Sequence, residues 1–246
     1  MVDVTRRGRP RWWGALALGV VAAAGAGLFL WGGDGAADDG DTALTSTTIP
    51  TGGLDVDAPD GWEAIPLRAL GFGLALPEDW ESVVLSGDGL ARIAEAAPVV
   101  PGFVDAAHAA AGTGSVFYAA GVDDAGHVTD LKVRAAADAG VDDPAGLEDY
   151  ARRLATEAHL TDPTVTVVED VPWPTVEVRY STPAPSADES ATEGTERSVL
   201  APNGVVYSLL VTSEDPAGHD ELADRLFGTL ALAPADAPEA DDPDAG

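Results

Sequence analysis

Residues 196–212 read ERSVLAPNGVVYSLLVT, and this stretch predicts a β-hairpin. At its centre stands Asn203-Gly204, a residue pair that suits a two-residue turn between antiparallel strands. The second arm, Val205 to Thr212, is apolar on both faces, so we expect it to lie inside a sheet. The hairpin therefore predicts a mainly antiparallel sheet.

Further short strands surround this hairpin in the sequence. Residues 127–135 alternate between apolar and polar side chains, which directs Asp130 and Lys132 toward water. The same alternation in Thr175 to Tyr180 directs Glu177 toward water. The other predicted strands are Ala64 to Leu67, Phe72 to Leu76, Glu81 to Leu85, Ser115 to Gly121 and Thr164 to Val168.

Amphipathic helices are expected between the strands. Asp143-Pro144-Ala145-Gly146 opens one with a favourable N-cap and an early proline, and the same four letters recur at 215–218 before another. Alanine-rich helices are expected at Leu90 to Ala97 and Phe103 to Ala111. Residues Thr182 to Thr195 are polar without periodicity and predict a loop. Helices layered on a mainly antiparallel sheet define an α+β fold.

An uncharged apolar run, Trp12 to Trp31, predicts one transmembrane helix. Its 20 residues would form a helix about 30 Å long, which matches the hydrocarbon core of a bilayer. Arginines precede it and aspartates follow it, so we expect a single-pass plasma (inner) membrane protein with a cytoplasmic N-terminus and an extracytoplasmic main domain. The alternative is a cleaved signal peptide, because Gly35-Ala36-Ala37 resembles a cleavage site.

These features divide the chain into five parts. Residues 1–11 form a basic cytoplasmic arm, and residues 12–31 form the transmembrane helix. Residues 32–61 read as a flexible linker rich in Gly, Asp, Thr and Pro. One folded domain is expected over residues 62–232, followed by a disordered acidic tail over residues 233–246.

The charge of the chain limits its partners. The sequence has 13 Lys and Arg against 42 Asp and Glu, for a formal net charge of −29. Such a surface repels nucleic acid and attracts cations or basic proteins. An acidic, lysine-poor composition equally suits a protein that stays soluble in high salt. The chain has no cysteine, so the domain must be stable without disulfides.

No catalytic, metal or cofactor motif stands out. The four histidines form no pair with another metal ligand at the i,i+4 spacing of a helical site, and no Gly-x-Ser-x-Gly or complete phosphate loop is present. We therefore expect no metal, no cofactor and no enzymatic activity. The carboxylates are too numerous for one pair to stand out, so a hydrolase acting on envelope polymers remains an alternative.

One tryptophan is a candidate for partner binding. Trp173 lies between Pro172 and Pro174, which stiffen the backbone and hold it extended. An exposed tryptophan held in this way suits a binding edge, whereas a tryptophan that covers a sheet edge is the plainer interpretation. Pro172, Trp173 and Pro174 are therefore the predicted partner-binding residues.

The segment Phe72 to Glu81, FGLALPEDWE, resembles the strand and Leu-Pro-x-x-Trp opening of the PsbP-like superfamily, which includes LpqN-type cell-envelope proteins. The order of elements over residues 62–232 is similar as well. The anchor, the 182–195 insertion and the acidic tail depart from that pattern. The resemblance implies an accessory or docking module without catalysis. We expect it to bind an envelope protein, with a carrier of an apolar ligand as a further alternative.

Overall fold

The computed structural model describes residues 54–85, 89–96, 98–160, 162–183 and 191–234. The predicted arm, transmembrane helix and most of the linker and tail lie outside these ranges. Within them, no helix combines the length and apolar character needed to cross a bilayer.

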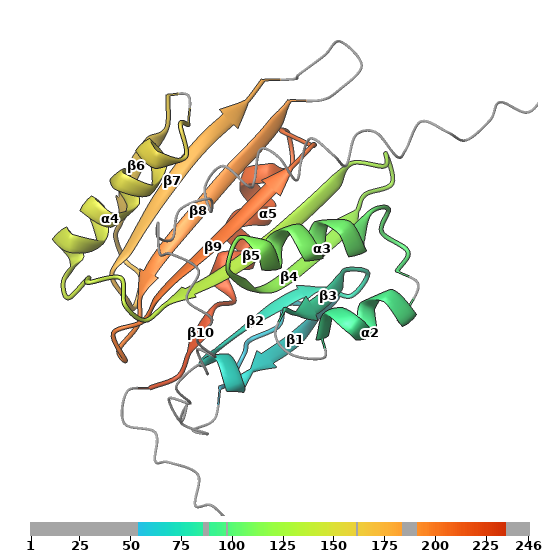
Figure 1. Cartoon of the computed structure of the whole chain (residues 1–246), viewed down its shortest axis with the longest axis horizontal. Coiled ribbons are helices and arrows are strands. Elements are labelled where there is room, and N and C mark those ends of the chain that lie inside the picture. Colours follow the sequence, from blue (N-terminus) through green and yellow to red (C-terminus); the bar gives the residue numbers. More distant parts are fainter. Residues whose placement is uncertain (1–53, 86–88, 97, 161, 184–190, 235–246) are drawn as a thin grey trace, which may run out of the picture.

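Seven strands of the described chain form one antiparallel sheet (Figure 1). Their order is β3-β4-β5-β9-β8-β7-β6, so β3 and β6 are the two edges. The bounds are β3 Glu81–Val84, β4 Ser115–Val122, β5 Val128–Ala136, β6 Thr164–Val168, β7 Thr175–Thr182, β8 Thr192–Leu200 and β9 Val206–Ser213.

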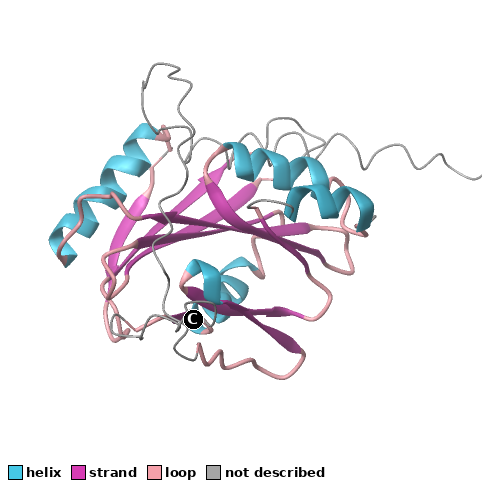
Figure 2. Cartoon of the chain, turned by 60° about the horizontal axis from the view of Figure 1, so that its bottom comes forward, coloured by secondary structure: helices cyan, strands magenta, loops and turns pink. Residues whose placement is uncertain are grey.

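A smaller antiparallel sheet has the order β1-β2-β10, with β1 Trp62–Leu67, β2 Phe72–Pro77 and β10 Ala231–Leu232. The 3-10 turn Arg68–Leu70 joins β1 to β2. Figure 2 shows this sheet and α5 (His219–Gly228) on one side of the large sheet. On the other side lie α2 (Gly89–Ala96), α3 (Phe103–Gly112) and α4 (Pro144–Glu157). The expected α+β layering of helices on antiparallel sheets is confirmed.

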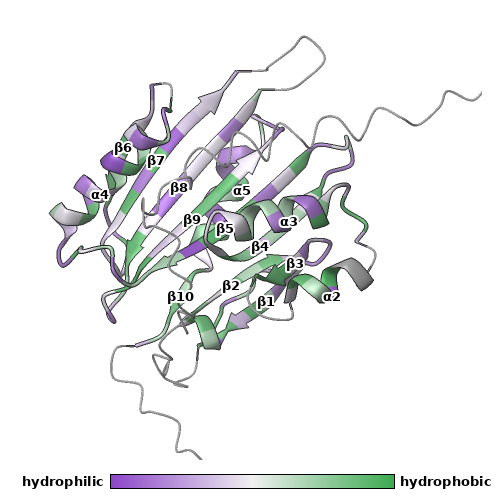
Figure 3. Cartoon of the chain, viewed as in Figure 1, coloured by the Kyte–Doolittle hydropathy of each residue, from purple (hydrophilic) through white to green (hydrophobic). Residues whose placement is uncertain are grey.

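The Asn203-Gly204 hairpin joins β8 to β9 as predicted. Gly204 adopts a left-handed φ of 79°, and its N–H donates to the Ala201 carbonyl at 2.9 Å. Every residue of β9 is buried, which confirms that this arm lies inside the sheet. In Figure 3, hydrophobic colour runs along much of β2 and β9, whereas hydrophilic segments interrupt β5, β7 and β8.

The two Asp-Pro-Ala-Gly segments fold differently. Asp143 caps α4 as predicted, accepting a hydrogen bond from the Gly146 N–H at 2.7 Å. Asp215 instead closes a turn by accepting from the N–H groups of Ala217 and Gly218, and α5 starts only at His219.

Three sequence-based assignments are wrong in detail. Asp130 and Lys132 are only 3% and 4% exposed, and Glu177 only 7%, although all three were expected to face water. Helices or the smaller sheet cover both faces of the large sheet, so these three side chains have little access to solvent. The predicted loop is also too long, since β7 ends at Thr182 and β8 already begins at Thr192. Leu54, assigned to the linker, is buried.

Candidate functional site

Pro172, Trp173 and Pro174 lie in the connection between β6 and β7, at one edge of the large sheet. Both prolines are exposed, while Trp173 is partly buried against the main core. Two hydrogen bonds hold this connection: the Thr175 hydroxyl donates to the Trp173 carbonyl at 2.9 Å, and the Leu200 N–H donates to the Pro174 carbonyl at 3.0 Å. The tryptophan therefore sits in a defined position beside β8.

Trp173 borders a pocket of about 180 Å³ on the side of the sheet that carries α5. The walls come from three regions: the β6–β7 connection, the strands β7 to β9, and the C-terminal end of α5. Most of the lining is apolar, comprising Val171, Pro172, Trp173, Thr175, Val199, Leu209, Phe227, Gly228 and Leu230, together with Arg197. Pro174 is not part of the lining, so the structure brings two of the three predicted residues to the pocket.

Among the described residues that line this pocket, Arg197 alone is charged. Its guanidinium lies 4.5 Å from the centroid of the Phe227 ring. It also donates to Glu177 Oε2 at 2.7 Å and to Asp224 Oδ1 at 2.6 Å. The planar cation is thus fixed by two carboxylates and one aromatic face, an arrangement that arginine suits and lysine does not.

Glu177 links the pocket to an exposed row of charges. Arg179 and Arg197 each donate to one of its carboxylate oxygens, and Arg179 continues to Asp220 at 2.7 Å. Burial alone would raise the pKa of Glu177, but the hydrogen bonds and charges of the two arginines hold it below its ordinary value. Glu177 therefore remains a carboxylate at neutral pH.

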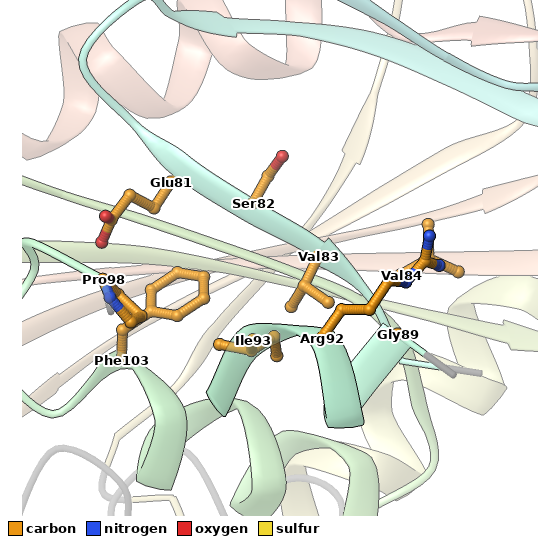
Figure 4. A pocket seen from close by; sticks show the side chains of 9 residues that line it. All are labelled: Glu81, Ser82, Val83, Val84, Gly89, Arg92, Ile93, Pro98 and Phe103. Atoms are coloured by element: carbon orange, nitrogen blue, oxygen red, sulfur yellow. The ribbon is translucent and has the colours of Figure 1, made fainter. Parts of the chain in front are cut away.

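A larger pocket of about 460 Å³ lies between β3 and α2 (Figure 4). Val83, Ile93 and Phe103 supply apolar walls, and Arg92 and Glu81 border it. The Glu81 carboxylate accepts from the N–H groups of Val99 and Val100 at 2.6 and 2.8 Å. Both oxygens of this carboxylate therefore bind the backbone of the loop before α3.

Buried polar groups lie on the face of the large sheet that is opposite the pocket beside Trp173. Lys132 Nζ is 3.0 Å from Asp130, which also accepts from the Thr212 hydroxyl. Burial raises the pKa of Glu196 to about 7, against the lowering effect of the Ser208 hydroxyl and the Arg134 charge. Within the described residues, Glu196 Oε1 has no hydrogen-bond partner.

The buried histidine and the buried Glu196 cannot act together as an acid–base pair. His219 Nε2 lies 2.8 Å from the hydroxyl of Thr195, the residue before Glu196 in β8. Successive side chains of a strand point to opposite faces, so the sheet separates the two groups. Over the described ranges, no three His, Cys, Asp or Glu side chains are grouped in a way that could hold a metal ion.

Sequence reasoning found Trp173 but missed Arg197, Glu177 and Phe227. These residues come from β8, β7 and α5, and their contact depends on a strand order that the sequence did not specify. The sequence placed Glu177 and Arg197 in two predicted strands that follow one another in the chain, which was the one hint of their contact. They are cross-strand partners only because the strands pair in the register Glu177↔Arg197, which the sequence did not specify.

Three solved structures are similar to this chain at low sequence identity. LpqN of Mycobacterium tuberculosis, involved in cell envelope biogenesis, is 12% identical over 70% of this chain and 91% of its own, with a TM-score of 0.40. The Ran-binding protein Mog1p of Saccharomyces cerevisiae is 8% identical over 73% and 97%, with a TM-score of 0.38. The cyanobacterial PsbP of Synechocystis sp. PCC 6803 is 7% identical over 74% and 98%, with a TM-score of 0.39.

No family profile matches the chain, and no curated protein sequence matches it. Similarities as distant as these three assign neither an activity nor a partner. The function proposed for this chain is therefore based on the geometry of its own pockets.

Proposed function

We propose that residues 62–232 form an extracytoplasmic docking module that binds a protein partner of the cell envelope. In this proposal the segment Trp12 to Trp31 anchors the module in the plasma membrane, and the module is not an enzyme. The pocket beside Trp173 receives an apolar side chain of the partner. The implied function of the PsbP-like superfamily, an accessory or docking role, agrees with this proposal.

The observation that carries the proposal is the composition of this pocket. An apolar concavity bordered by a tryptophan and an ordered arginine combines the residue types that dominate binding energy at protein interfaces. Its volume of about 180 Å³ suits one or two side chains rather than a drug-sized ligand. A protein partner therefore fits this site better than a small molecule.

The charge of the chain adds a second, longer-range contribution. With a formal net charge of −29, the chain attracts basic proteins and speeds their association. Exposed charges are screened over about 8–10 Å at physiological ionic strength, so this contribution declines as salt is added. Contact with Trp173 depends on apolar burial and persists in salt.

A pull-down at low and high salt tests the proposal. The full-length chain with Trp173→Ala should capture less envelope protein than wild type at both salt concentrations. The expected decrease in binding free energy is about 2 kcal/mol. Trp62→Ala is the matched control, because Trp62 is also partly buried against the main core but lies beneath Arg225 and away from this pocket. Equal capture by wild type and Trp173→Ala would refute the site.

The hydrolase alternative needs a separate test. Purified protein should turn over neither glycan nor ester substrates. Turnover that a single carboxylate substitution abolishes would overturn the docking proposal in favour of an enzyme.

A carrier of an apolar ligand is the second candidate, and the pocket between β3 and α2 favours it. Its volume of about 460 Å³ falls in the range of small-molecule sites. Binding of a fluorescent fatty acid that Ile93→Asp abolishes, with Val167→Asp as the exposed control, would support this function. No binding by the wild-type chain would exclude it for that ligand class.

A further inference from the structure

The edge strand β6 has an unusual composition for this acidic chain. Its sequence, Thr164 to Val168, is TVTVV, so every residue is β-branched and none is charged. Val167 is 47% exposed. Natural edge strands are normally protected from pairing by lysine, proline, inward-pointing charges or a bulge. Pro163 directly precedes β6, but none of these features occurs within its five residues.

The register shows which backbone groups of β6 face away from the sheet. The Leu200 N–H donates to the Pro174 carbonyl, which makes this a hydrogen-bonded pair of β7 and β8. Hydrogen-bonded pairs alternate along antiparallel strands, so Glu177 directs its backbone groups toward β6, where it pairs with Thr166. The backbone N–H and C=O groups of Val165 and Val167 consequently point outward from the edge.

The opposite edge of the sheet is arranged differently. There β3 begins with the charged Glu81, whose carboxylate binds the loop before α3. A Cβ atom on Gly89 would lie 1.9 Å from the Val84 carbonyl oxygen, so the start of α2 covers this end of β3. Of the two edges, β6 is therefore the one that offers backbone groups for pairing.

Acidic residues flank β6 and determine what can pair with it. Asp162 precedes the strand, Glu169 and Asp170 follow it, and all three are exposed. Antiparallel pairing of two copies about Thr166 would bring Asp162 of each copy toward Asp170 of the other. Like charges placed opposite each other are destabilising, so this arrangement disfavours a second copy and favours a strand with basic flanks.

We infer that β6 binds an extended segment of a partner protein by strand addition, and that this segment has an uncharged β-branched centre with Lys or Arg at both ends. The inference rests on the proposed docking function and names the partner's recognition element. The β6 strand leads through Val171 directly to Pro172 and Trp173, so a paired segment would run alongside the pocket.

A synthetic peptide, Lys-Lys-Thr-Val-Thr-Val-Thr-Lys-Lys, tests the inference with the full-length chain. It should slow amide hydrogen exchange in residues 164–168. Val167→Pro removes an outward N–H without removing a bond to β7, because edge strands accept proline where the N–H faces solvent. This substitution should weaken peptide affinity by about fivefold, the effect of one lost hydrogen bond. Thermal unfolding checks that the variant is folded.

Two peptides and two variants complete the test. A peptide of equal charge, Lys-Lys-Thr-Pro-Thr-Pro-Thr-Lys-Lys, should give no protection, and a glutamate-flanked version should bind more weakly. Val167→Lys keeps the N–H, adds a like charge and should also weaken binding. Equal binding of the proline-containing peptide, or protection outside β6, would overturn the inference. Trp173→Ala should leave peptide affinity unchanged, since the peptide has no side chain that would fill the pocket. The experiment therefore distinguishes a wrong inference about β6 from a wrong proposal about the pocket.

Discussion

The Arg197 guanidinium lies over the Phe227 ring, 4.5 Å from its centroid, and this contact joins the apolar pocket to the charged row on the same face of the sheet. Arg197 can occupy this position because Glu177 and Asp224 neutralise it. The pocket thus presents a cation that is oriented before any partner arrives, which reduces the entropy lost on binding.

Replacing Arg197 should destabilise the domain. Arg197→Ala leaves the buried Glu177 paired with Arg179 alone among the described residues and exposes the face of Phe227. We expect a loss of about 2 kcal/mol in the free energy of unfolding, measured by chemical denaturation. Arg197→Lys should be intermediate, because an ammonium group cannot reproduce the planar fork.

Arg152→Ala is the matched control for this prediction. Arg152 also binds a carboxylate, Glu148, at 2.6 Å, but its side chain is 55% exposed on α4. Its loss should change the free energy of unfolding by less than about 0.5 kcal/mol. If the two arginine variants unfold alike, the pocket arginine has no special structural role.

Stability should depend on pH through Glu196. Burial raises the pKa of this carboxyl from 4.5 to about 7, so the folded state retains the proton to a higher pH than the unfolded chain does. The stabilising contribution is complete below pH 4.5 and is lost as pH rises to about 7, with a limiting slope of about 1.4 kcal/mol for each pH unit. Denaturation of wild type and Glu196→Gln across this range measures the difference.

His219 changes the pH dependence of stability in the opposite direction, so its effect must be separated from that of Glu196. Burial lowers the pKa of His219, so its contribution is present above its ordinary value of 6.5 and declines as pH falls. The difference between wild type and Glu196→Gln removes the histidine from the comparison. Parallel stability curves for these two proteins would show that Glu196 does not titrate between pH 4.5 and 7.

The sequence was sufficient to predict those elements that depend on residues close to one another in the chain. The Asn203-Gly204 turn, the Asp143 cap and the positions of the strands at Val128–Ala136 and Thr175–Thr182 depend on residues close in the chain, and the structure has all three. Trp80 is the tryptophan of the Leu-Pro-x-x-Trp segment. It packs partly buried against the main core, with its indole directly over Gly121.

The sequence was insufficient where burial depends on distant elements. Polar residues at alternate positions of Val128–Ala136 normally indicate a face in water, but helices cover that face of the sheet here. Asp130 and Lys132 are tolerated there because they neutralise each other at 3.0 Å. Likewise, the pocket beside Trp173 needs α5 next to β8, a long-range contact that no local pattern encodes.

Gly121 should be intolerant of any side chain. A Cβ atom at this position would lie 2.2 Å from Trp80 Nε1, so Gly121→Ala must displace the indole from β4. We expect a loss of about 1–3 kcal/mol in the free energy of unfolding. Gly112→Ala lies at the end of α3, where the added methyl would meet no atom of the other described elements within 4 Å, and it should be neutral or slightly stabilising. In a Trp80→Ala background the penalty at Gly121 should vanish, and a penalty that persists would contradict this explanation.

The proposed membrane topology predicts where each end of the chain resides. A reporter enzyme that is active only outside the plasma membrane should be active when fused to the C-terminus and inactive when fused to the N-terminus. The physical reason is the arginine-rich flank before Trp12, which favours the cytoplasmic side, so replacing Arg6, Arg7, Arg9 and Arg11 with Glu should reduce C-terminal reporter activity. The protein should also stay with membranes after alkaline extraction, since 20 apolar residues suffice to span the bilayer. A mature protein that begins near Asp38 and is released from membranes would replace the anchor with a cleaved signal peptide, and the docking module would then act as a secreted domain.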